Sequence, residues 1–229
     1  MERWYHKNMN PLNYLHLQLR LEGKALVRGY FMRQVKAVPG EEMPLMLITQ
    51  LADKEPVIYY DEAISLDLQN ELAASLREIK FPNLEAALGV VQKHNVIYEV
   101  GHYKTYLFPL LPVSDKDVLR LSKDDPNVKA FGFEGFAEQV YAIEHDGNIV
   151  SACVSTRENE ECGEAWVYTI PEYRHQGFAQ KVVSAWAAGL MDVGKIPFYS
   201  HKLENTASAN LAGKLGMQLI FEEISITRS

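Results

Sequence analysis

Cysteine is scarce in this chain of 229 residues, which has only Cys153 and Cys162. Neither their spacing nor their neighbours fit a zinc site, so we expect no metal centre and no disulfide framework. Cys153 lies in an apolar, strand-like run and is expected to be a small buried side chain, whereas Cys162 lies in the polar stretch E-N-E-E-C-G. This usage is typical of a reducing compartment, and we expect a cytoplasmic protein.

Long apolar runs and an excess of basic residues are also absent. No stretch approaches the length of a membrane span, and the N-terminus, M-E-R-W-Y-H-K-N-M-N, has no apolar signal-peptide core. We therefore expect no membrane partner. The formal net charge of -7 argues against nucleic acid as a partner. The acidic loop from Glu158 to Glu161 could attract polyamines or lysine side chains, although it is also typical of a solvated loop.

Residues 1–99 predict an α/β region with little sign of chemistry. The alternating leucines from Leu15 to Leu21 fit a strand or a helix, and both alternatives stay open. Short buried strands are expected at 44–49 and 56–60. Helices are expected on Leu68, Leu72, Leu76 and Ile79, and again after Asn83, which can cap the second of them.

Residues 100–229 contain a clearer order of elements. Strands are predicted at 95–100 and 105–109, and a short helix from Ser114 to about Lys123. A loop-rich segment with Phe131, Phe133 and Phe136 follows, and then an antiparallel pair turning at Asp146-Gly147. A strand at 164–170, a strand at 197–201, a helix at about 207–215 and a last strand or strand pair at 218–227 complete the order.

The stretch from Tyr168 to Gly194 predicts a strand, a tight turn and a helix. Pro171 should end the strand, and apolar residues from Ala179 to Leu190 recur at helical spacing. The turn therefore lies at a helix N-terminus, where main-chain N–H groups without partners and the helix dipole favour an anion such as a phosphate. Gly177 would let main chain approach a ligand closely.

The spacing R-x-x-G-x-A at Arg174, Gly177 and Ala179 resembles the acyl-CoA-binding signature of the GCN5-related N-acetyltransferase (GNAT) superfamily. A second similar segment, N-T-A-S-A-N-L-A-G-K-L-G-M, starts at Asn205. The resemblance implies a mixed α/β fold for residues 100–229, with a mainly antiparallel twisted sheet flanked by helices. Residues 1–99 then form either an added α/β domain or a degenerate GNAT-like half.

The resemblance further implies an acyltransferase that uses acetyl-CoA as co-substrate and needs no metal. Main-chain groups of Tyr168, Thr169 and Ile170 would lie along the pantetheine. The pyrophosphate would lie on the turn formed by Arg174, His175, Gln176, Gly177, Phe178 and Ala179. Asn205 and Ser208 match positions that contact coenzyme A, but Asn205 would equally suit a helix cap. The acceptor would be a small-molecule or peptide amine, and many relatives form homodimers.

Proton transfer is where the sequence departs from the family. The tyrosine that many members use to protonate the leaving thiolate is replaced by Ala212. Tyr199, His201 and Glu164 are the candidate catalytic residues in its place. The alternative is a catalytically silent acyl-CoA-binding or regulatory module. By analogy the three phenylalanines could line the acceptor site, although core packing is the more common role of such residues.

Overall fold

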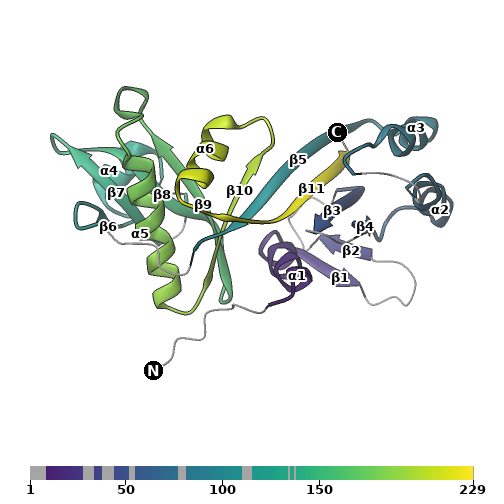
Figure 1. Ribbon diagram of the computed structural model, residues 1–229, viewed down its shortest axis with the longest axis horizontal. Helices are drawn as coiled ribbons and strands as arrows, with labels where there is room; N and C mark the ends of the chain where they lie inside the picture. Colours follow the sequence, from purple (N-terminus) through teal and green to yellow (C-terminus); the bar gives the residue numbers. More distant parts are fainter. Residues whose placement is uncertain are drawn as a thin grey trace. The chain divides into compact units, whose positions relative to one another are not determined.

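The computed structural model describes residues 9–27, 34–37, 44–51, 55–76, 81–109, 115–133, 135–136 and 138–228 (Figure 1). The chain divides into two compact units. The C-terminal unit contains Thr105–Leu219, and the other contains Pro11–Lys104 with Ile220–Ser229. The final segment belongs to the second unit because it pairs with a strand there. The functional division expected from the sequence, 1–99 and 100–229, stays a prediction.

The C-terminal unit is built on a sheet whose order is the end of β5, then β10, β9, β8, β7 and β6. Its strands are β5 (Tyr98–Leu107), β6 (Leu119–Ser122), β7 (Gln139–His145), β8 (Asn148–Glu158), β9 (Cys162–Thr169) and β10 (Ile196–Lys202). Strands β6 to β9 form antiparallel pairs, and β10 pairs with β9 in parallel. The turn at Asp146-Gly147 joins β7 to β8 as predicted, with both residues at positive φ.

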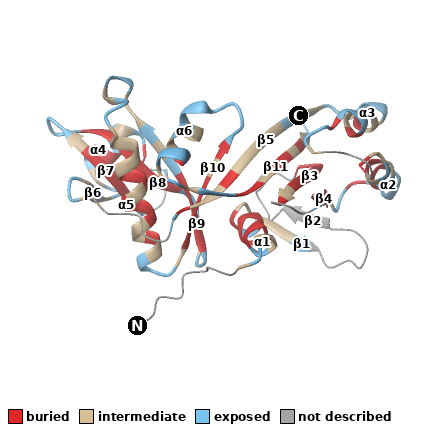
Figure 2. Ribbon diagram, viewed as in Figure 1, coloured by how far each residue is buried: buried red, intermediate tan, exposed pale blue. Residues whose placement is uncertain are grey.

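Helices cover both faces of this sheet. α5 (Phe178–Asp192) packs on one face through Val182, Val183 and Trp186, while α4 (Pro126–Phe131) packs on the other through Val128. Because side chains alternate along a strand, Tyr141 and Ile143 of β7 belong to the α5 core, and Val140 and Ala142 belong to the α4 core. Figure 2 shows buried residues running along α5 and the strands beneath it. α6 (Thr206–Lys214) packs against α5 and β10.

Four local predictions are wrong. The segment expected to form a helix ending near Lys123 contains β6 instead, because Leu119–Ser122 pairs with β7; Ser114 lies outside the described residues. The segment expected as a loop contains α4, whose start is capped by Asp125 and favoured by Pro126. One strand, β5, replaces two, and Cys162 is buried at the start of β9 rather than in a loop.

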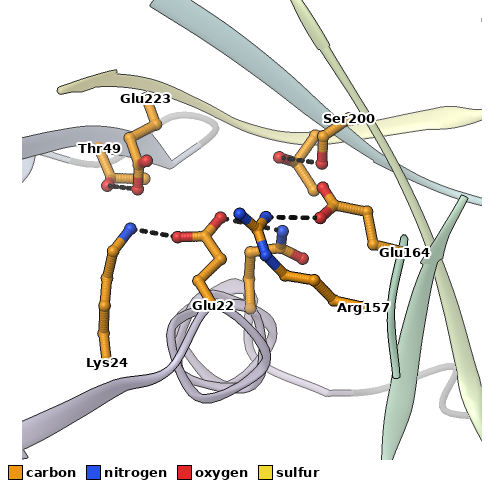
Figure 3. Close-up of polar contacts among 9 residues, drawn as sticks. Glu22, Lys24, Thr49, Arg157, Glu164, Ser200 and Glu223 are labelled. Atoms are coloured by element: carbon orange, nitrogen blue, oxygen red, sulfur yellow. Dashed lines mark hydrogen bonds and ion pairs between the residues drawn. The ribbon is translucent and has the colours of Figure 1, made fainter. Parts of the chain in front are cut away.

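The second unit contains a sheet in the order β1, β2, β4, β3, β11 and the first part of β5. Its elements are α1 (Pro11–Leu21), β1 (Lys24–Val27), β2 (Gln34–Ala37), β3 (Met46–Leu51), β4 (Val57–Asp61), α2 (Leu66–Ser75), α3 (Glu85–Lys93) and β11 (Gln218–Arg228). The alternating leucines are helical in α1. Leu68, Leu72 and Leu76 pack into the core as predicted, whereas Ile79 lies outside the described residues. On the other face of this sheet, Thr49 of β3 donates a hydrogen bond to Glu223 of β11 (Figure 3).

The predicted fold class is confirmed, because in each unit the strands pair mostly antiparallel and helices pack on them. Short parallel pairings occur between β9 and β10 and between β2 and β4. The parallel pairing of β9 with β10 follows from the connection between them, since α5 is the crossover that a parallel pair needs.

Gly189 in α5 provides a test of the packing of this helix on the sheet. A Cβ at this position would collide with the Tyr141 side chain, whose Cζ lies 2.7 Å from the Cβ position. We expect Gly189→Ala to lower the free energy of unfolding by about 1–3 kcal/mol because the overpacked interface must shift. The measurement is denaturant unfolding.

Gly213→Ala in α6 is the matched control, since a Cβ there has nothing within 4 Å. Alanine favours a helix over glycine by up to about 1 kcal/mol, so this variant should be neutral or more stable. Equal losses in both variants would contradict the packing explanation.

Candidate functional site

The pairing between β9 and β10 ends early. The register runs from Ile196 opposite Cys162 to Phe198 opposite Glu164 and stops there. Both strands continue beyond this point, β9 to Thr169 and β10 to Lys202. The edge of β9 from Ala165 to Thr169 is therefore not paired with β10 in the described register, and its main-chain groups can serve an extended ligand.

The turn after β9 places main-chain N–H groups at the start of α5. His175 and Gly177 both have positive φ, 65° and 82°. Gly177 is the N-cap residue, and the first turn of α5, as described, has no side-chain cap. The first N–H groups of the helix therefore have no side-chain acceptor, and together with the helix dipole they favour an anion.

A pocket of about 400 Å³ lies where these two features meet. Its walls come from the end of β9, the turn, the start of α5, Tyr199 of β10 and one face of α6. The predicted residues that line it are Tyr168, Thr169, Arg174, His175, Gly177, Phe178, Ala179, Tyr199, Asn205 and Ser208. Ile170, Gln176, Glu164 and His201, also predicted, are not among its lining residues.

Arg174 has a different role from the one expected of its charge. Its Nε donates a hydrogen bond to the Thr169 carbonyl oxygen at 3.0 Å, and its guanidinium lies 5.9 Å from the centre of the Tyr168 ring. The Thr169 hydroxyl in turn hydrogen-bonds Ser151 at 2.8 Å. Arg174 thus holds the turn against the end of β9 while still lining the pocket.

α6 contributes the opposite wall, and Asn205 shapes its beginning. The Asn205 Oδ1 accepts a hydrogen bond from the Ser208 main-chain N–H at 3.0 Å, which is an N-cap. Asn205 also lines the pocket. The two roles left open by the sequence are therefore compatible, because the cap fixes the side chain at the pocket wall.

Tyr199 is the candidate catalytic residue that lies in this pocket. Its side chain is 2% exposed, and the Ser208 side chain partly opposes the effect of burial on the pKa of the phenol. Burial raises the pKa of Tyr199 to about 12, because the phenolate would be poorly solvated there. Tyr199 is therefore a protonated hydroxyl at neutral pH.

His201 lies further along β10, outside the pocket lining. Its Nδ1 is 2.8 Å from the Lys202 carbonyl oxygen, and the ring stacks on Tyr106 with centroids 5.4 Å apart. The buried Nε2 has no hydrogen-bond partner among the described residues. In the same region Thr105 and Ser200 share a hydrogen bond across β5 and β10 (Figure 3).

Glu164 is buried at the point where the strands separate, and it is paired. Arg157 Nη1 lies 3.2 Å from its Oε2 (Figure 3). Alternation along β9 places Ala165 and Val167 in the α5 core, so Glu164, Trp166 and Tyr168 belong to the opposite face. A base there would act from the face away from Tyr199.

Sequence reasoning missed several residues of the pocket. They are Val167, Tyr173, Gln180, Ala207, Asn210, Leu211 and Lys214. The signal was present for α6, because Ala207, Leu211 and Lys214 recur at helical spacing with Ser208. Lys214 forms no ion pair with a described residue, whereas Lys181 is held by Asp115 and Asp117 at 3.0 Å each. Lys214 is thus the lysine available to an anionic ligand.

Ala212 faces the core instead of the pocket opening. It is 1% exposed and packs in the cluster of Trp186 and Tyr199. In the described part of the chain, no three His, Cys, Asp or Glu side chains are placed to hold a metal ion. None of the described helices is long and apolar enough to cross a membrane.

Known proteins resemble this chain in the same region. The family model described as GNAT acetyltransferase matches residues 127–223. The uncharacterized N-acetyltransferase YdfB of Bacillus subtilis is 32% identical over 96 residues, which cover 42% of this chain and 36% of that protein. The chain thus spans about a third of the length of this curated relative.

One solved structure shares the fold at low identity, and a second is similar over part of the chain. An acetyltransferase of the GNAT family from Colwellia psychrerythraea has a TM-score of 0.50 at 10% identity, with 97% of this chain and 98% of that chain covered. A GNAT-family structure from Novosphingobium aromaticivorans has a TM-score of 0.48 at 20% identity, covering 57% of this chain and 66% of that one.

The cap at Asn205 can be tested by stability. Asn205→Ala removes the acceptor for the Ser208 N–H, and we expect a loss of about 1 kcal/mol in the free energy of unfolding. Asn205→Asp retains an acceptor oxygen at a helix N-terminus and should stay within about 0.5 kcal/mol of the unmodified protein. Thermal or urea unfolding measures both. An equal loss in both variants would show that the cap is not the stabilising contact.

Proposed function

From the match of residues 127–223 to the GNAT acetyltransferase family model, we propose that the protein transfers an acetyl group from acetyl-CoA to a primary amine. The single observation that carries the donor assignment is the pocket at the early end of the β9–β10 pairing. It joins an unpaired strand edge to an anion-binding helix start, which are the two features that an extended pantetheine and its pyrophosphate require.

The residues of the pocket fit this ligand from one end to the other. The edge of β9 offers main-chain groups to the amides of the pantetheine arm. The N–H groups after Gly177 offer donors to the pyrophosphate, and Lys214 offers charge to a phosphate. Arg174 contributes by holding the turn in place through the Thr169 carbonyl.

Transfer forms a bond between the amine nitrogen and the acyl carbon and breaks the bond to sulfur. The amine loses one proton, and the departing thiolate gains one. Tyr199 is the group in the pocket suited to supply that proton, because it lines the pocket and its hydroxyl is protonated at neutral pH. In this proposal Tyr199 on β10 takes the role that a helix tyrosine has elsewhere in the family, where this chain has Ala212.

A second candidate function is a silent acyl-CoA-binding module. The observation that favours it is Ala212, which is buried and has no ionisable group that could protonate the leaving thiolate. The two functions separate cleanly. Binding of acetyl-CoA by calorimetry without release of free thiol over a broad panel of amines would favour the silent module, and thiol release would exclude it.

Gly177 tests the donor site, and Gly194 provides its control at the other end of the same helix. Both glycines have a φ of 82°, so alanine at either position should cost about 1–2 kcal/mol of stability. Gly177→Ala should also weaken acetyl-CoA binding by about tenfold or more, because the turn that presents the N–H groups must rearrange. Gly194→Ala should leave the affinity unchanged. Equal affinities in the two variants, measured by calorimetry, would exclude the turn as the donor site.

Tyr199→Phe tests the proton donor. We expect kcat to fall by about 100-fold or more, in the range of general acid catalysis, with acetyl-CoA affinity changed little. The raised pKa keeps Tyr199 protonated until the pH approaches about 12, so loss of its proton should not limit kcat at pH 9 or 10. Ser208→Ala, which leaves the phenol in place, should have a smaller effect. An unchanged kcat in Tyr199→Phe would remove this role.

A further inference from the structure

The face of β9 that turns away from α5 carries two exposed aromatic side chains. Trp166 and Tyr168 are each 40% exposed. Their partners across the sheet on β8 are Val154 and Ala152, which are both small and buried and do not cover the exposed part of either ring. Large apolar side chains exposed side by side next to a pocket usually mark a binding surface.

Three phenylalanine side chains pack against the rings of Trp166 and Tyr168. Trp166 stacks on Phe133 with centroids 4.6 Å apart, and Phe136 lies 4.5 Å from it. Phe131 lies 5.8 Å from Tyr168. Phe133 is 2% exposed and belongs to the α4 core. The phenylalanines thus pack as core residues and hold Trp166 and Tyr168 in fixed positions. We call Trp166 and Tyr168 the aromatic face.

The aromatic face is continuous with the donor pocket. Tyr168 lines the pocket, and Trp166 and Tyr168 lie on the stretch of β9 that is not paired with β10. A group stacked on the aromatic face therefore lies beside the strand edge proposed to hold the acyl donor. Successive residues of a strand are about 3.3 Å apart, so the acceptor needs only a short spacer between its ring and its amine.

The charges around the aromatic face disfavour a polycation. The Arg174 guanidinium lies over the Tyr168 ring. Glu164, the carboxylate on the same face, is already neutralised by Arg157. The formal charge of these three side chains is positive, so a polyamine would meet repulsion, whereas an amine with a single charge and an apolar body would meet a complementary surface.

From these observations we infer that the acceptor is a monoamine with an aromatic body, such as an arylalkylamine, whose ring stacks on Trp166 and Tyr168. The inference deepens the proposed function and rests on it for the transfer step. Binding of the amine to the aromatic face can nevertheless be measured without any turnover.

The first experiment measures binding by fluorescence. Trp186 is 1% exposed, so Trp166 is the described tryptophan that a ligand can reach. Titration with 2-phenylethylamine should change the emission of the unmodified protein, and Trp166→Phe should abolish that change while keeping a ring in place. An equal change in Trp166→Phe, or no change at all, would overturn the inference, whatever the outcome with acetyl-CoA.

The second experiment measures turnover as thiol release from acetyl-CoA. The KM for 2-phenylethylamine should be about tenfold or more below the KM for spermidine. Trp166→Ala should raise the KM for 2-phenylethylamine by about tenfold. Trp166→Phe should recover most of the loss, and the KM for acetyl-CoA should stay constant. Val193→Ala, at a residue 65% exposed on the far end of α5, is the neutral control.

The two proposals fail in different ways. Thiol release with spermidine preferred, and no effect of Trp166→Ala, would overturn the aromatic acceptor and leave acetyl transfer standing. Fluorescence changes that depend on Trp166, without thiol release from any amine, would overturn acetyl transfer and leave the binding surface standing.

Discussion

The early end of the pairing between β9 and β10 is the constraint on which the site depends. Two parallel strands that start in register and then separate leave main-chain groups without sheet partners, and such groups are stable only if something else hydrogen-bonds them. The separation needs firm boundaries on both sides. β9 is held by its antiparallel pairing with β8 from Gly163 to Thr169, and β10 is held near its end by the hydrogen bond between Ser200 and Thr105 of β5.

The turn after β9 forms the second part of the candidate site, next to the strand edge that is not paired with β10. His175 and Gly177 adopt left-handed conformations just before α5, and the first N–H groups of that helix have no side-chain cap. Arg174 fastens the turn to Thr169, the last residue of the strand. A side chain that sequence reasoning assigned to the ligand thus also serves the geometry of the loop, and the positive charge that it leaves near Tyr168 affects both faces of β9.

Much of this arrangement could be predicted from local signals. The turn chemistry at Asp146-Gly147, the helical spacing in α5 and the glycine at the helix start each depend on a few neighbouring residues. The helix expected after Ser114 failed for the opposite reason: Leu119–Ser122 pairs with β7, and pairing between distant segments overrides local propensity. The pocket face of α6 was also missed, although Ala207, Leu211 and Lys214 recur at helical spacing with Ser208. No local signal separates Tyr199 from His201, since only the fold decides that one lines the pocket.

Because side chains alternate along β9, the two faces of this strand contact different surroundings. Val167 belongs to the α5 side, Trp166 and Tyr168 to the other, and the main-chain edge runs between them. A single inserted or deleted residue in β9 would exchange the two sets, because the period of a strand is two residues. A substitution in β9 can therefore change the proposed donor pocket or the aromatic face separately. An insertion or deletion in this strand would change both surfaces at once.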